Sequence, residues 1–172
     1  MNPYHSIGLA PVINAAGKMT YLGSSAVSHA VAETMALAAQ SYVDMASLKR
    51  NVCERIAAML GVEGACVTSC AAAGIAISVA ACLTGSDLDR IEALPEIKGP
   101  RREVIVQKGH VVHFGANLTQ MIRMTGATVR EIGSVNGVRP YHRRGAIGDQ
   151  TAAVLYVVSH HAVSNEMLTL RE

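Results

Sequence analysis

The chain has 172 residues, a formal net charge of +2 at pH 7 and a composition that is 50% hydrophobic. This length suits one medium-sized domain, and so much apolar sequence excludes an intrinsically disordered chain. Because so small a charge provides no basic surface for phosphate backbones, we expect no nucleic-acid partner.

The cysteines form no CxxC motif, and the first residues do not have the pattern of a secretory signal peptide. We therefore expect free thiols in a reducing cytoplasm. Residues 65–84 form an uncharged stretch that is long enough to cross a bilayer. They are rich in Ala, Ser, Cys and Thr, which favours a buried strand–turn–helix, so we expect no contact with a membrane.

The first predicted element is an irregular arm over residues 1–24, where glycines and serines favour turns. A single domain is expected over residues 25–172. Ser24 or Ser25 is placed to cap a helix over about 26–39, because a serine hydroxyl accepts a hydrogen bond from the first helical turn.

A second helix is predicted over residues 46–60, where apolar side chains spaced by about four residues form one stripe. Gly61 is suited to end this helix in a left-handed conformation. A short strand is expected at 65–68, and it turns directly into a helix over 71–83.

After a polar loop over residues 86–102, the sequence predicts a buried strand at 103–107 and a helix within 114–126. A strand is then expected within 127–133, followed by a loop over 134–150 with an Asn-Gly turn.

The last predicted strand covers residues 152–158. Strands that are continuously apolar and alternate with helices are typical of an α/β fold with a layered, mostly parallel sheet. Residues 159–172 provide no helix to cover the last strand, so we expect this sequence to be the front part of a longer domain.

The turn from strand to helix at residues 67–74 is a candidate phosphate site. A helix begins after small residues, so the backbone N–H groups of its first turn can bind an anion, and the Ser69 hydroxyl can add a donor. The alternative is that the small residues serve close packing of helix and sheet. A Rossmann-like nucleotide-binding fold is a weaker alternative, because the GxGxxG motif is missing.

His110 and His113 follow the strand at 103–107 directly, at the end where α/β sheets bind ligands. Either imidazole can stack on a planar ring; the alternative is a histidine that fills a surface loop. A metal site would combine these two residues with His160 and His161. Their spacing matches no zinc signature, so we expect no metal.

Cys70 lies at the start of the helix predicted over 71–83, a position that lowers the pKa of a thiol and can create a nucleophile. The alternative is a cysteine that packs as a small apolar residue. No spacing of His or Asp residues favours a Cys–His pair.

Several segments follow one another in an order typical of a known family. They are VINAAGKMTYLG (12–23), SYVDMASL (41–48), GVEGACVTSCAAAGIAISVAACLTG (61–85), EVIVQKGHVVHFGANLTQMIRMTGATVREIG (103–133) and AIGDQTAAVLYVVSHHAV (146–163). In this series the chain resembles the selenocysteine-synthase-like branch of pyridoxal-phosphate (PLP) enzymes, with the aspartate-aminotransferase type of fold. Within that branch it is similar to the D-glucosaminate-6-phosphate ammonia-lyase kind. The resemblance implies that the layered sheet is the first part of the PLP-binding large domain.

The resemblance also implies roles for single residues. Ser69, Cys70 and Ala71 match the family's cup for the PLP phosphate, although the family commonly has Gly where Cys70 stands. His110, preferred over His113, matches the residue that lies over the pyridine face.

The arm matches the segment that lines the active site in the family, usually at a dimer interface. This match implies a homo-oligomer, with Thr20 as a candidate substrate contact.

PLP chemistry needs a lysine that bonds covalently to the cofactor and an acidic partner for the pyridine nitrogen. In the family both follow the strand that corresponds to 152–158, at positions beyond residue 172. The lysines of this chain lie elsewhere, at Lys18, Lys49, Lys98 and Lys108. We therefore expect no catalytic residue in this chain and no PLP catalysis by the chain alone; either it is truncated or a second chain supplies the rest.

The parent reaction that the resemblance implies is elimination and deamination of a small phosphorylated amino sugar acid. One alternative is a non-catalytic, truncated paralogue that acts as a dimerisation or binding module. A selenocysteine-synthase-type transferase is less well supported, because that enzyme carries an RNA-binding extension before the arm.

Overall fold

The computed structural model describes residues 2–172 and separates into two compact units, one that ends at Val52 and one over Cys53–Glu172. The arm expected over residues 1–24 lies within the first unit. The helices of this unit are η1 (Pro3–Ile7) and η2 (Thr20–Leu22), both of the 3₁₀ type, and α1 (His29–Ala38). Helix α2 (Met45–Leu60) begins in the first unit and ends in the second.

The two helices predicted before residue 61 are present. Helix α1 is capped by Ser28, whose hydroxyl accepts a hydrogen bond from the first turn, and not by Ser24 or Ser25. Ser24 has a φ of 68°, which places it in a turn. Gly61 follows α2 with a φ of 65°, as predicted.

The second unit is an α/β domain with a three-stranded sheet. Its elements are α3 (Ala71–Thr84), α4 (Leu88–Glu92), β1 (Glu103–Gln107), η3 (Lys108–His110), α5 (Leu118–Arg123), β2 (Thr128–Ile132), α6 (Pro140–Ala146) and β3 (Thr151–Leu155). The strands are parallel and lie in the order β2-β1-β3, which confirms the predicted parallel sheet.

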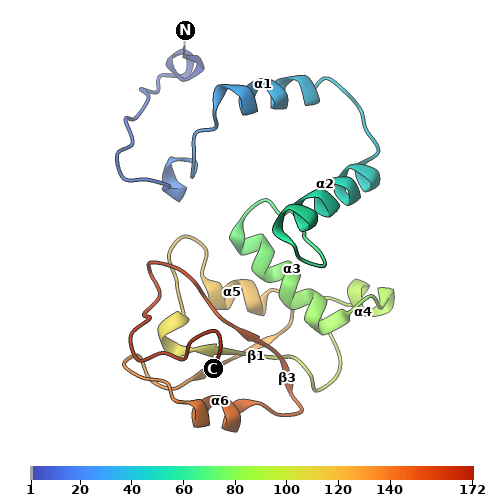
Figure 1. The fold of residues 1–172 in the computed structure, drawn as a ribbon, viewed down its shortest axis with the longest axis vertical. Helices are drawn as coiled ribbons and strands as arrows, with labels where there is room; N and C mark the ends of the chain where they lie inside the picture. Colours follow the sequence, from blue (N-terminus) through green and yellow to red (C-terminus); the bar gives the residue numbers. More distant parts are fainter. Residues whose placement is uncertain (1) are drawn as a thin grey trace. The chain divides into compact units, whose positions relative to one another are not determined.

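Helices cover both faces of this sheet (Figure 1). On one face, Val104 and Val106 of β1 pack in the core formed with α3 and α5. On the other face, Ile105 packs with Ala146 of α6 and with Leu168. Since successive residues of a strand point to opposite faces, β1 is the central strand of three layers and is buried from both sides.

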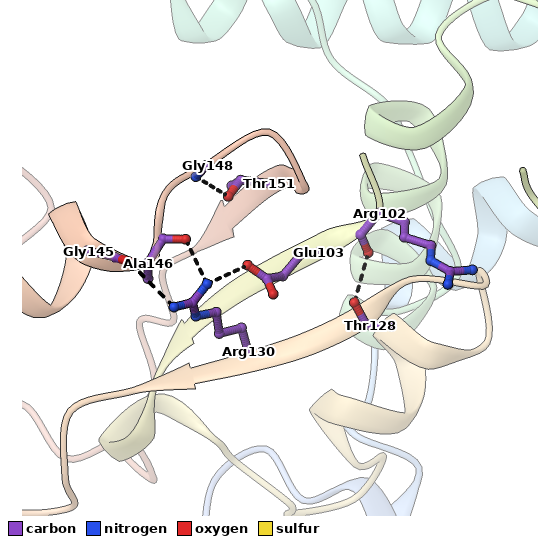
Figure 2. A network of polar contacts seen from close by, with 8 residues as sticks. All are labelled: Arg102, Glu103, Thr128, Arg130, Gly145, Ala146, Gly148 and Thr151. Carbon is purple, nitrogen blue, oxygen red and sulfur yellow. Dashed lines mark hydrogen bonds and ion pairs between the residues drawn. The ribbon is translucent and has the colours of Figure 1, made fainter. Parts of the chain in front are cut away.

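Polar contacts hold the end of the sheet at which the strands begin (Figure 2). The Arg130 guanidinium on β2 donates to the Glu103 carboxylate on β1 over 3.4 Å and to the carbonyl of Ala146 over 3.1 Å. At the start of β3, the Thr151 hydroxyl accepts from the Gly148 amide over 3.0 Å. These contacts fix α6 and all three strands, and they leave the carboxyl ends of the strands for other groups.

Four predictions differ from the structure. Residues 65–68 form no strand, because no neighbouring strand pairs with them. The polar loop over 86–102 contains α4, which the Asp87 carboxylate caps. The loop over 134–150 contains α6, and β3 ends at Leu155, three residues before the predicted end.

Within residues 2–172, no helix combines the length and the apolar character that a bilayer-spanning segment needs. The uncharged stretch at residues 65–84 instead forms a loop and helix α3, which packs on the sheet.

Candidate functional site

The candidate site lies where the strands of the second unit end. In a parallel sheet the carboxyl ends of all strands share one edge, and the loops that follow them can bring distant residues together. Strand β1 is followed by η3, and β3 is followed by residues 156–163. Helix α3 begins near the same edge, because Ala71 and Leu155 line one groove of about 370 Å³ between α3 and β3.

The amino end of α3 presents free backbone donors. Cys70 is the cap residue: the Ala73 amide donates to its sulfur over 3.5 Å, and the Gly74 amide donates to its carbonyl over 3.0 Å. In the described part of the chain, the amides of Ala71 and Ala72 have no carbonyl acceptor. Such amides, with the positive end of the helix dipole, are suited to bind an anion.

Side chains beside these amides are accessible. Ser69 and Cys70 are exposed, and the Ser69 hydroxyl lies 4.0 Å from the Cys70 sulfur. The Ala73 amide, and after it the Ser69 hydroxyl, lower the pKa of the Cys70 thiol. Ser69, Cys70 and Ala71 thus lie together at the amino end of α3.

His110 lies at the end of η3 with its ring only 1% exposed. Its Nδ1 accepts a hydrogen bond from the Val157 amide over 3.2 Å, and the Tyr156 ring meets it edge-on at 4.7 Å. Burial lowers the pKa of the imidazole, so the neutral ring, with its proton on Nε2, is favoured. The structure therefore places His110 between the ends of β1 and β3, beneath Tyr156.

His113 is the more accessible of the two imidazoles that follow β1. Its ring is exposed, and its Nε2 lies 3.1 Å from the hydroxyl of the buried Thr119.

A further group of rings lies on the same two loops. The rings of Phe114 and His161 have centroids 4.1 Å apart, and those of His160 and His161 are 3.9 Å apart. The sequence did not predict that these three rings lie together, although two adjacent histidines after a strand were a signal for it.

Two sequence expectations concern residues elsewhere. Thr20 lies in η2 of the first unit and is exposed. Within residues 2–172, no three His, Cys, Asp or Glu residues are grouped so that they could hold a metal ion.

Lys108 is the lysine nearest in sequence to the end of β1. Its amino group forms an ion pair with Glu131 of β2 over 3.6 Å. The second unit thus offers backbone donors at the start of α3 and several imidazoles, and it directs Lys108 toward a carboxylate.

The chain is similar to several known proteins. The chain is 42% identical over 169 residues to D-glucosaminate-6-phosphate ammonia lyase of Salmonella typhimurium, covering 98% of this chain and 46% of that protein. It is 39% identical over 171 residues to 5'-C-glycyluridine monooxygenase-decarboxylase of a Streptomyces species, covering 98% of this chain and 43% of that protein. An L-seryl-tRNA(Sec) selenium transferase of Desulfotalea psychrophila is 30% identical over 162 residues, which are 87% of this chain and 31% of the transferase.

A solved structure of D-glucosaminate-6-phosphate ammonia-lyase matches with a TM-score of 0.94 at 42% identity, covering 99% of this chain and 47% of that one. No family model matches the chain. The chain therefore spans somewhat less than half the length of the ammonia lyase and of the monooxygenase-decarboxylase.

Proposed function

The chain is a relative of D-glucosaminate-6-phosphate ammonia lyase and of the L-seryl-tRNA(Sec) selenium transferases, and we propose that it forms the cofactor-phosphate site of a PLP-dependent enzyme. The observation that carries this proposal is the amino end of α3, where the amides of Ala71 and Ala72 lack carbonyl acceptors beside the exposed Ser69 hydroxyl. A phosphate monoester matches these donors in charge and size.

The whole enzyme, in this proposal, removes ammonia from a small phosphorylated amino acid. When bound, PLP withdraws electrons from the amino acid and so stabilises the charge that remains after proton loss. His110 or His113 contacts the pyridine face, and Thr20 contacts the substrate. In this proposal the lysine that holds the cofactor covalently is none of the four in residues 1–172; Lys108, the one nearest in sequence to the end of β1, forms an ion pair with Glu131.

The reaction type is part of the proposal and needs its own assay. The two relatives near 40% identity are named for different reactions, one an ammonia lyase and one a monooxygenase-decarboxylase. Ammonia release from D-glucosaminate 6-phosphate, measured with the complete enzyme, decides between them.

The proposal includes self-association. None of residues 2–52 is buried, and large apolar side chains on α1 are exposed, among them Val31, Met35 and Leu37. Exposed apolar surface of this kind marks an interaction site, and we propose that a second copy of the chain covers it.

The cofactor site is tested by binding of PLP to the 172-residue chain. Removing the Ser69 hydroxyl deletes one hydrogen bond to a charged group, worth about 1.5–3 kcal/mol, so Ser69→Ala should weaken PLP binding roughly tenfold or more. Ser78→Ala is the matched control, because Ser78 lies on the same helix two turns further on and is exposed as well. Binding is measured by the quenching of tyrosine fluorescence or by calorimetry.

Pyridoxal, which lacks the phosphate, should bind much more weakly than PLP. Equal affinity for the two compounds, or equal effects of Ser69→Ala and Ser78→Ala, would show that α3 does not hold the phosphate. Reduction with borohydride followed by mass analysis tests the lysine: a specific adduct on Lys18, Lys49, Lys98 or Lys108 contradicts an external lysine.

A further inference from the structure

Ring-bearing side chains are concentrated in the two loops that follow β1 and β3. These loops carry four of the seven histidines of the chain, together with a phenylalanine and a tyrosine. The six residues are His110, His113, Phe114, Tyr156, His160 and His161. A chain with so few aromatic residues thus places much of its ring surface at one edge of the sheet.

The two loops contact each other at several points, and these contacts hold the rings in place. The Val163 amide donates to the Gly109 carbonyl over 2.9 Å, and the Val157 amide donates to His110 Nδ1. Further out, the rings of Phe114 and His161 are in contact. A Cβ on Gly109 would meet the Met167 sulfur at 2.8 Å, so the joined loops also pack closely against the residues that follow them.

The ring nitrogens of His160 and His161 differ from those of the other two loop imidazoles. His110 and His113 each use one nitrogen, toward the Val157 amide and the Thr119 hydroxyl. Among residues 2–172, neither His160 nor His161 has a hydrogen-bond partner on its ring, and no carboxylate oxygen lies within 4.0 Å of these rings. Both residues are exposed, so their nitrogens are available to a ligand.

The short distance between these two rings places their free nitrogens side by side. With ring centroids 3.9 Å apart, a ligand with several acceptor oxygens can accept a hydrogen bond from each ring. The charged pair on the neighbouring elements, Lys108 and Glu131, is neutral as a whole. A phosphate monoester, which offers three acceptor oxygens and up to two negative charges, matches two neighbouring N–H donors better than an uncharged ligand does.

We propose that His160 and His161, with Phe114 supporting the His161 ring, bind the phosphate group of the substrate. This inference rests on the proposed function, and it assigns a second phosphate site, distinct from the α3 site for the cofactor. The names of two relatives contain two different compounds, D-glucosaminate 6-phosphate and 5'-C-glycyluridine. Only the first carries a phosphate monoester, so a phosphate site at His160 and His161 favours a substrate of the first kind.

Nuclear magnetic resonance of the imidazole groups tests the assignment in the 172-residue chain with PLP present in excess. Addition of D-glucosaminate 6-phosphate should shift the His160 and His161 signals, because the phosphate oxygens accept hydrogen bonds from these rings. D-glucosaminate without the phosphate should leave both signals in place. Equal responses to the two compounds overturn the proposal.

Variants supply the second measurement. The double variant His160→Asn/His161→Asn should bind D-glucosaminate 6-phosphate at least about tenfold more weakly at pH 6, since two charge-assisted hydrogen bonds are lost. His5→Asn, a change at another exposed histidine, should retain the affinity. Both variants change exposed side chains, and unchanged circular dichroism shows that the fold is retained. Unchanged affinity in the double variant contradicts the proposal.

The outcome separates this inference from the proposed function. If PLP alone shifts the His160 and His161 signals as strongly as the substrate does, these rings belong to the cofactor site and the inference is wrong. If PLP does not bind but the phosphorylated sugar acid still shifts both signals, the inference holds and the cofactor proposal fails.

Discussion

His110 illustrates how a residue predicted for one role acquires its properties from its surroundings. The sequence places it directly after a strand, which suggested contact with a cofactor. In the structure its ring is buried, accepts a hydrogen bond from the Val157 amide and meets Tyr156 edge-on. A buried imidazole with a satisfied acceptor holds the ends of β1 and β3 together whether or not it contacts a ligand.

The lowered pKa of His110 makes stability depend on pH. Burial disfavours the charged ring in the folded state, so below an unfolded pKa of about 6.5 the unfolded chain binds more protons. The free energy of unfolding should therefore be greatest above pH 6.5 and fall as the pH drops from there toward the lowered pKa.

Urea unfolding at pH 7.5 and pH 5.5 measures this dependence. His110→Asn keeps an acceptor for the Val157 amide but cannot titrate, so the loss of stability at pH 5.5 should be smaller in this variant. His5→Asn, which changes an exposed ring, should keep the wild-type dependence. Identical pH dependence in His110→Asn and wild type would mean that other groups cause it.

Among the elements, the turn from α5 into β2 depends most on a single residue type. Gly126 has a φ of +85°, and a Cβ there would overlap the carbonyl oxygen of Pro95. The backbone conformation and the close approach both require glycine. This turn sets where β2 begins, and hence its register with β1.

Gly126→Ala should consequently destabilise the protein by more than about 3 kcal/mol, because conformational strain and a clash with backbone add together. Gly61→Ala is the control: Gly61 has a φ of +65° but open space around it, so only the strain of about 1–2 kcal/mol applies. Chemical denaturation compares the two, and similar losses would show that the Pro95 contact relaxes at little cost.

At the scale of the whole molecule, the two units differ in how much they bury. The second unit contains the core, with Val104, Ile105 and Val106 fully buried, whereas none of residues 2–52 is buried. Backbone amides in buried strands exchange slowly with solvent, and exposed helices open readily. The amides of β1 should therefore exchange far more slowly than those of α1.

Self-association adds a concentration dependence to this contrast. If a second copy covers the first unit, hydrogen exchange in α1, followed by mass spectrometry, should slow as the protein concentration rises, while β1 stays unchanged. Met35→Lys on α1 should weaken this effect, whereas Ile77→Lys, an equally drastic change at an exposed position of α3, should not. Rapid exchange of α1 at every concentration argues against the proposed oligomer.

The sequence alone determined most of the helices and the central strands. Apolar spacing and Gly61 identified α2, and the apolar run at residues 103–107 identified β1 within its observed bounds. Helices α1 and α3 were predicted near their observed bounds, although α1 is capped by Ser28 and not by Ser24 or Ser25. These signals are local, because they arise from the period of a helix or strand and from the residues at its ends. The short helices α4 and α6 were missed, since five to seven residues show too little periodicity.

The tertiary structure determined strand pairing and the contacts between residues distant in sequence, which local sequence patterns do not encode. Val67 and its neighbours have the composition of a strand but lack a pairing partner, and Phe114 and His161 are 47 positions apart in sequence yet meet as stacked rings. The helix start at residues 69–71 was predictable because a helix end is formed by adjacent residues; its role as a phosphate cup remains a proposal. The ring surface was not, because only the parallel arrangement of β1 and β3 brings the loops after them to the same edge of the sheet.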